Sequence, residues 1–179
     1  MEHIERINRT LVHEGAVINL YDDEMRLPDG SIKHYDFIGH IGASCVIPVL
    51  PDKRILMVKQ YRSALDRYTY EIPAGKRDSE TEDYEICALR ELKEETGFEA
   101  KKIERLLILN TTVAFCNELI YVFYAEVDDT QGIQHLDEDE FIDVYPMELS
   151  ELEKMIYSGE LRDSKTVAAI LAYKNKYLK

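Results

Sequence analysis

Three glutamates in the middle of the chain are the residues most able to do chemistry. Glu91, Glu94 and Glu95 stand in the stretch Arg90-Glu91-Leu92-Lys93-Glu94-Glu95-Thr96-Gly97. In a helix, residues three and four positions apart lie on one face, so these carboxylates would repel each other by about 0.2–0.5 kcal/mol per pair. A divalent cation such as Mg²⁺, which takes oxygen ligands, would relieve the repulsion. The alternative is an acidic helix face that only meets solvent, and composition by itself favours that alternative.

The residues around the glutamates predict the helix that would hold them. An apolar stripe at helical spacing predicts a helix over residues 81–96, and its members are Tyr84, Cys87, Ala88 and Leu92. Ser79 and Glu82 have the spacing of a capping box, and Gly97 stands where a glycine commonly ends a helix. Upstream, Ile72-Pro73-Ala74-Gly75-Lys76 predicts a turn that can aim backbone carbonyl groups at a cation on the helix.

The rest of the chain alternates between strand and turn patterns. Apolar segments predict strands at residues 16–27, 31–38, 43–50, 54–61, 68–72, 103–110, 119–127 and 141–145, and two later helices at 148–157 and 164–177. Pro28-Asp29-Gly30 has turn chemistry, so the first two strands should form a hairpin. The pattern predicts an α+β fold with a mixed β-sheet between helices. We expect a small antiparallel β element at residues 1–40 and the main domain at residues 41–179.

Composition and charge exclude several classes of protein. The chain has 179 residues, 45% of them hydrophobic, which fits a globular domain and no disordered or membrane-spanning chain. Its 22 Lys and Arg against 35 Asp and Glu give a net charge of −13, which repels nucleic acid and anionic membranes. The three cysteines form no CxxC pair and the charged amino terminus resembles no signal peptide. We therefore expect a cytoplasmic protein that binds neither nucleic acid nor membrane.

The segment of residues 75–98 resembles the Nudix box, the motif of the Nudix hydrolases. The positions that fill the motif are Gly75, Glu82, Arg90, Glu91, Leu92, Glu94, Glu95, Gly97 and Phe98. One spacing differs, because six residues, 76–81, separate Gly75 from Glu82 where the family has five. The added residue falls in the turn before the helix, where insertions are tolerated, and it leaves the acidic cluster in register.

The resemblance implies hydrolysis of a nucleoside diphosphate linked to another group, with Mg²⁺ as the cofactor and Mn²⁺ as a substitute. It makes Glu91, Glu94 and Glu95 the catalytic residues. Glu91 and Glu95 would be the principal metal ligands, joined by the carbonyl group of Ala74, and Glu94 would be a further ligand or a supporting acid.

The remaining residues of the motif would support the ligands. By resemblance, Arg90 and Glu82 pair to brace the loop against the helix, and Gly75 belongs to the same support. Loss of such a partner typically lowers metal affinity or activity by about 10- to 100-fold.

Outside the box, the chain resembles the ADP-ribose pyrophosphatase branch of the family over nearly its whole length. The matching segments are residues 27–30, 59–62, 70–76, 137–142 and 159–166. The likeness implies that Arg62 contacts the substrate phosphates and that Glu71 supports Arg62 or the substrate. It also implies that Glu140 activates or orients the attacking water, with Glu138 as the alternative. From the residues alone, Arg62 fits a surface ion pair equally well, and most acids at 137–140 would be solvated.

This branch implies a substrate and an assembly. The substrate is ADP-ribose, split into AMP and ribose 5-phosphate, although Val113 stands where the branch usually has a proline. The alternatives are another nucleoside-diphosphate sugar such as GDP-mannose, or a module that senses a nucleotide without turnover. The amino-terminal hairpin would cross a homodimer, and aromatic residues on it could stack on a base, although such residues more often pack on the sheet: Tyr21, Tyr35 and Phe37.

Overall fold

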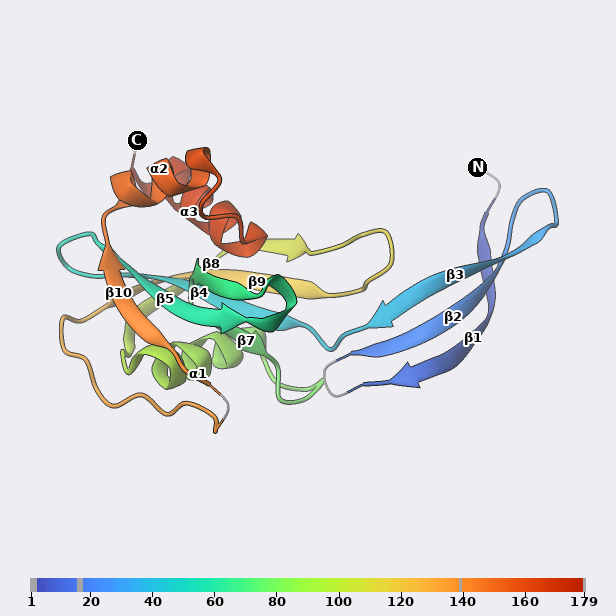
Figure 1. Ribbon diagram of the computed structural model, residues 1–179, viewed down its shortest axis with the longest axis horizontal. Helices are drawn as coiled ribbons and strands as arrows, with labels where there is room; N and C mark the ends of the chain where they lie inside the picture. The colour runs from blue at the N-terminus through green and yellow to red at the C-terminus, as the bar shows by residue number, and fades with distance from the viewer. Residues whose placement is uncertain (1–2, 16–17, 139, 179) are drawn as a thin grey trace. The chain divides into compact units, whose positions relative to one another are not determined.

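The computed structural model describes residues 3–15, 18–138 and 140–178, and they form two compact units (Figure 1). The amino-terminal unit comprises residues 1–42 and 110–119, and the larger unit comprises residues 43–109 and 120–179. No helix in the described part of the chain is both long enough and apolar enough to cross a membrane.

The amino-terminal unit is a three-stranded antiparallel sheet. Its strands β1 (Glu5–Glu14), β2 (Asn19–Arg26) and β3 (Ile32–Gly39) follow one another in the sheet. The predicted turn joins β2 to β3, where Gly30 has a φ of 83°, a conformation that glycine adopts without a Cβ penalty. The predicted hairpin is thus present, but β1 is an additional strand that its charged sequence did not predict. The predicted start of β2 at residues 16–17 lies outside the described residues.

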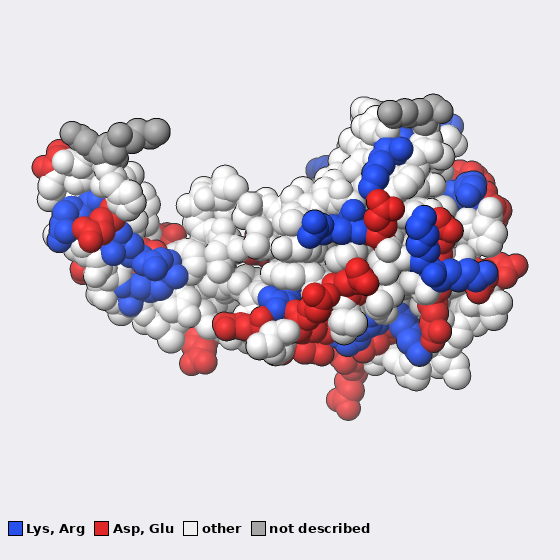
Figure 2. Space-filling view, turned by 180° about the vertical axis from the view of Figure 1, so that it is seen from behind, with Lys and Arg blue, Asp and Glu red and all other residues white. Residues whose placement is uncertain are grey.

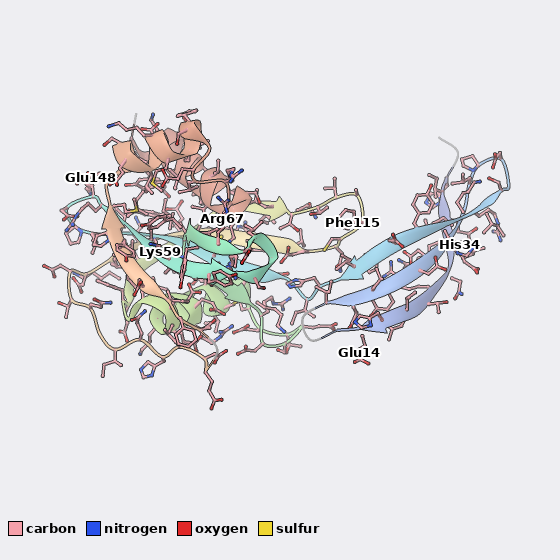
Figure 3. All side chains as sticks on the ribbon, viewed as in Figure 1. Glu14, His34, Lys59, Arg67, Phe115 and Glu148 are labelled. Atoms are coloured by element: carbon pink, nitrogen blue, oxygen red, sulfur yellow. The ribbon has the colours of Figure 1, made fainter. Side chains whose placement is uncertain are left out.

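A partly buried ion pair holds one face of this small sheet together. Arg9 donates to both carboxylate oxygens of Asp23 at 2.6 Å, and its guanidinium lies 3.5 Å from the centre of the Phe37 ring. The bond from Arg9 lowers the pKa of Asp23, which is only 7% exposed. The segment 110–119 joins the same unit, because Ile38 donates its N–H to the carbonyl of Phe115, which Figure 3 labels.

The larger unit contains a mixed β-sheet, as expected. Its strands are β4 (Ala43–Val49), β5 (Ile55–Arg62), β6 (Arg67–Glu71), β7 (Ala74–Lys76), β8 (Ala100–Asn110), β9 (Leu119–Val127) and β10 (Asp143–Met147). The order is β10-β5-β4-β9-β8, with β6 beside β5 and β7 beside β4. Strands β4 and β9 are parallel, whereas β5 and β7 are antiparallel to β4.

Three helices cover the two faces of this sheet (Figure 1). Helix α1 (Tyr84–Thr96) packs on one face through Ala88 and Leu92, and α2 (Leu149–Ser158) and α3 (Ser164–Tyr177) pack on the other. Every residue of β4 is buried, so its side chains alternate between the two apolar cores. The predicted α+β fold with a mixed sheet between helices is confirmed.

Several element boundaries differ from the prediction. Helix α1 begins three residues later than expected, because Asp83 is its N-cap and accepts from the N–H groups of Glu85 and Ile86. The carboxylate of Glu82 instead accepts from the N–H of Asp78 at 2.7 Å, in the preceding loop. The end of helix α1 at Gly97, which has a φ of 74°, agrees with the prediction. Strand β10 begins at residue 143 and not at 141, and a short 3₁₀ helix, η1 (Ser63–Leu65), follows β5.

Candidate active site

The acidic face of α1 lies against the turn at residues 73–76. Glu95 is 2% exposed and Glu91 is 8% exposed, so both carboxylates are buried in the larger unit. Glu95 accepts the N–H of Ala74 at 3.0 Å. A Cβ on Gly75 would lie 2.0 Å from Oε1 of Glu91, so the backbone approaches this carboxylate as only glycine permits. Glu91 can keep this position only while residue 75 is a glycine, even though one extra residue separates it from Glu82.

Arg90 connects the acidic residues of the helix with the preceding loop. Its Nε donates to Glu82 at 3.1 Å, and its Nη1 donates to Glu91 at 2.7 Å and to Glu94 at 3.0 Å. Its Nη2 reaches the backbone carbonyl of Lys76 at 3.1 Å. The expected contact between Arg90 and Glu82 is therefore present, and the same guanidinium also touches two of the candidate metal ligands.

Burial makes the two inner glutamates unusual acids. It raises the pKa of Glu91 to about 7, although the charge of Arg90 opposes the increase. Burial and the neighbouring charge of Glu91 raise the pKa of Glu95 well above its usual value. Two desolvated carboxylates so close together are costly without a cation, because each disfavours the ionised form of the other. Their oxygen donors fit a hard divalent ion, which is commonly held by one or two carboxylates plus substrate phosphates.

The acidic cluster is an open arrangement and not a closed metal cage. Across residues 3–15, 18–138 and 140–178, no three or more His, Cys, Asp and Glu side chains are grouped closely enough to enclose an ion. Glu94 is less buried than its two neighbours in the cluster, with 37% of its side chain exposed. An ion held by Glu91 and Glu95 would take the rest of its ligands from substrate and water.

A second charged group lies beside the cluster, around Glu71 at the end of β6. Arg62 donates to both oxygens of Glu71 at 2.7 Å, and the ammonium group of Lys165 donates to it at 2.5 Å. Burial alone would raise the pKa of Glu71, but the bonds from Arg62 and the charge of Lys165 lower it to about 2. The sequence did not single out Lys165, although it stands in the matching segment 159–166. Its contact with Glu71 joins residues that are far apart in the chain.

A cavity of about 820 Å³ opens next to this charged group. It is lined by Arg62, Arg67, Thr69, Tyr70, Glu71 and Lys165, together with the residues that precede α3. Arg67 begins β6 and is labelled in Figure 3. Cavities of this size hold small-molecule ligands. Lys and Arg side chains lie among Asp and Glu side chains on the face of the larger unit that Figure 2 shows.

The loop between β9 and β10 carries the two candidate bases. Glu140 is half-buried, and its carboxylate accepts the N–H of Asp137 at 3.1 Å. Its charge contributes to the raised pKa of both Glu91 and Glu95, so it lies within electrostatic reach of the cluster. Glu138 is exposed to solvent. Position 139, between them, is outside the described residues.

The remaining sequence candidates belong to the amino-terminal unit. Tyr21 and Phe37 pack on each other with ring centres 5.8 Å apart, which is the sheet packing weighed as the alternative to base stacking. Tyr35 is 48% exposed, and Val113 is 85% exposed in the segment 110–119.

Comparison with known proteins is consistent with this geometry. A family model described as the NUDIX domain matches residues 39–170. The chain is 39% identical over 165 residues to an ADP-ribose pyrophosphatase of Bacillus subtilis (strain 168), a match that covers 92% of this chain and 89% of the relative. It is 38% identical over 160 residues to a methanol dehydrogenase activator of Bacillus methanolicus, covering 89% and 86% of the two chains.

A solved structure shares the fold. The crystal structure of an ADP compounds hydrolase superposes with a TM-score of 0.83 at 18% identity, and the match covers 96% of this chain and 92% of that one. The matching domain spans both sheet faces, helix α1 and the turn that meets its acidic residues. With most of its length matched in this way, the chain belongs to the NUDIX domain family.

Proposed function

We propose that this protein hydrolyses the pyrophosphate bond of ADP-ribose to give AMP and ribose 5-phosphate, with Mg²⁺ as its cofactor. The observation that carries the proposal is the buried pair Glu91 and Glu95, held against Gly75 and Ala74. The relative named ADP-ribose pyrophosphatase supports the choice of substrate because it aligns over 92% of this chain.

The acidic residues of α1 would hold the cation. Glu91 and Glu95 are the proposed ligands, and the carbonyl group of Ala74 would be the third ligand from the protein. Glu94 would be a further ligand or a supporting acid. Mn²⁺ should replace Mg²⁺, since both accept carboxylate and carbonyl oxygens. When bound, a divalent cation neutralises charge on the pyrophosphate and lowers the pKa of the attacking water.

The chain's own side chains would orient the reaction. Glu82 holds the guanidinium of Arg90, and Arg90 in turn holds Glu91 and Glu94 at fixed positions. The Nε and Nη2 groups of Arg62 donate to Glu71, so the N–H groups of Nη1 can bind a phosphate oxygen. A guanidinium fixed in this way loses little freedom when the phosphate arrives.

Glu140 is the proposed acceptor of the proton that the attacking water gives up. Its half-buried position and its electrostatic coupling to Glu91 and Glu95 support it over the exposed Glu138. A general base must lie within hydrogen-bond reach of the water in the substrate complex, and a loop residue can meet that requirement when its loop is held in place.

We also propose a division of labour between the parts of the chain. Residues 1–40 would form the dimerisation element of a cytoplasmic homodimer, and residues 41–179 would carry the reaction. The exposed strands of the small sheet support this role, because a sheet with one unburied face gains stability from a partner surface.

The test is product analysis with purified protein and a panel of ADP-ribose, ADP-glucose, GDP-mannose, NADH and diadenosine polyphosphates, with and without Mg²⁺. Cation-dependent release of AMP and ribose 5-phosphate from ADP-ribose is the expected result. Faster turnover of GDP-mannose would keep the mechanism and change the substrate. Binding without cleavage of any compound would overturn the enzymatic proposal in favour of a nucleotide sensor.

A further inference from the structure

The loop between β9 and β10 is attached to the carboxyl-terminal end of α1 (Figure 1). A helix leaves its last carbonyl groups without partners inside the helix, so other groups must supply donors. Here the backbone N–H of Gly132 donates to the carbonyl of Gly97 at 2.8 Å, and the N–H of His135 donates to that of Glu94 at 2.9 Å. The loop therefore completes the end of the helix that carries the acidic cluster.

Two glutamine side chains extend this attachment in different ways. Gln131 donates from Nε2 to the carbonyl of Thr96 at 3.0 Å. Gln134 donates from Nε2 to the carbonyl of Glu95 at 2.6 Å and also to that of Ile142 at 3.2 Å. Both N–H groups of the Gln134 amide are thus used, one on the helix and one on the far end of the loop.

These contacts make Gln134 a clamp, by which we mean that its one amide group binds both the end of α1 and the far end of the loop. Ile142 is 6% exposed and belongs to the folded body of the unit, whereas the neighbouring Phe141 is 80% exposed. The segment between Gln134 and Ile142 contains Glu140. Because Gln134 donates to the carbonyl groups of both Glu95 and Ile142, the two ends of this segment are tied to the backbone of Glu95. Gln131 differs, because within the described part of the chain its amide donates only to the carbonyl of Thr96, at the end of the helix.

We propose that Gln134 is a positioning residue for hydrolysis, which holds the segment carrying Glu140 at a fixed place relative to the backbone of Glu95. This inference rests on the proposed function, since it assigns a role within that reaction. Gln134 donates its amide N–H groups to the backbone carbonyl groups of Glu95 and Ile142. Its effect passes through the loop, and a displacement of about 1 Å at a reacting group can cost about 100-fold in rate.

The test compares Gln134→Met with Gln131→Met. Methionine matches glutamine in length and carries no donor and no charge, so each change removes only the hydrogen bonds of one side chain. For ADP-ribose with Mg²⁺, we expect Gln134→Met to lower kcat by about 10- to 100-fold with KM within about twofold of wild type. Gln131→Met should leave both constants within about twofold, because one bond at a helix end contributes little.

A second measurement needs neither substrate nor cation. Amide hydrogen exchange followed by NMR should show the N–H groups of His135 and Glu140 exchanging at least about 10-fold faster in Gln134→Met, and unchanged in Gln131→Met. Unchanged exchange in Gln134→Met would overturn the clamp. Faster exchange with an unaltered kcat would overturn its role in the reaction.

Failure of the proposed function is recognised separately. It appears as a wild-type protein that cleaves no member of the substrate panel, before any variant is made. An equal loss of kcat in both glutamine variants would also overturn the inference, because it would trace the effect to the helix end in general.

Discussion

The carboxylate of Glu91 occupies the space that a side chain at Gly75 would need, with 2.0 Å between Oε1 and the position of a Cβ. We therefore expect Gly75→Ala to push Glu91 out of its place and to lower kcat by about 10- to 100-fold. Product release from ADP-ribose measures this effect. Lys76→Ala, next in sequence and exposed, is the control and should have nearly wild-type activity. Wild-type activity in Gly75→Ala would show that Glu91 can move without consequence.

Substitution of Glu95 by glutamine should lower catalysis strongly without damage to the fold. Glu95→Gln keeps the shape of a residue that is 2% exposed and keeps an oxygen for the N–H of Ala74. We expect turnover to fall by at least about 100-fold. We also expect the variant to lose the increase in Tm that Mg²⁺ gives the wild type, because a ligand that binds the folded state stabilises it. Glu99→Gln, on an exposed residue beyond the helix, is the matched control. An unchanged response to Mg²⁺ would remove Glu95 from the metal site.

The two candidate bases can be separated by the same substitution at each position. Glu140→Gln should lower kcat by about 100-fold or more, the usual contribution of a general base. Glu138→Gln, on an exposed side chain, should lie within about twofold of wild type. The reverse result would assign the proton transfer to Glu138. Each variant is compared at saturating ADP-ribose and Mg²⁺, so that binding differences do not enter.

Glu71 should contribute strongly to stability through its two cationic partners. Glu71→Gln removes one of the two carboxylates that bind Lys165, whose side chain is 12% exposed and which keeps its contact with Asp163 at 2.9 Å. Removal of one member of a buried pair costs about 3–5 kcal/mol in the free energy of unfolding, and the remaining contact places the expected loss at the lower end of that range. Urea denaturation measures the change. Glu153→Gln is the control, because its partner Lys174 is 44% exposed and such pairs contribute about 0–1 kcal/mol. Equal effects of the two substitutions would contradict this interpretation.

The same residue predicts how stability depends on pH. The pKa of Glu71 is about 2 in the folded protein, against an ordinary value of 4.5. The stabilisation is fully present above the ordinary pKa, and it is lost as the pH falls from about 4.5 toward 2, where the folded protein also takes up the proton. The loss should amount to about 3 kcal/mol. Chemical denaturation at several pH values should show a smaller loss over this window in Glu71→Gln than in wild type.

Local patterns in the sequence predicted much of the larger unit. Strand β9 and helix α3 have the predicted bounds, because each combines an apolar pattern with clear signals at its ends. Strand β1 was missed, since residues such as Leu11 and Val12 are exposed on it and give no buried alternation. Its stability comes instead from pairing with β2 and from the Arg9 and Asp23 pair, both of which depend on residues distant in the sequence.

The residues of the candidate site also fall into those that sequence spacing predicted and those that it did not. Helical spacing placed Glu91, Glu94 and Glu95 together, but it could not show that Glu95 is buried whereas Glu94 is partly exposed. Lys165 and Gln134 reach the site from segments far along the chain, and their distance in sequence from Glu71 and Glu95 hides both contacts. Such contacts follow from the path of the chain in space and have no periodic signature.

The attachment of the loop to α1 also sets an order of events during folding. The carbonyl groups at the end of α1 receive their donors from residues 131–135, which leave the ribosome well after the helix has been synthesised. Until those residues have been synthesised, the last turn of α1 lacks these donors. A nascent chain can therefore form the apolar part of this helix first, and the donors for the end that carries the acidic cluster follow later.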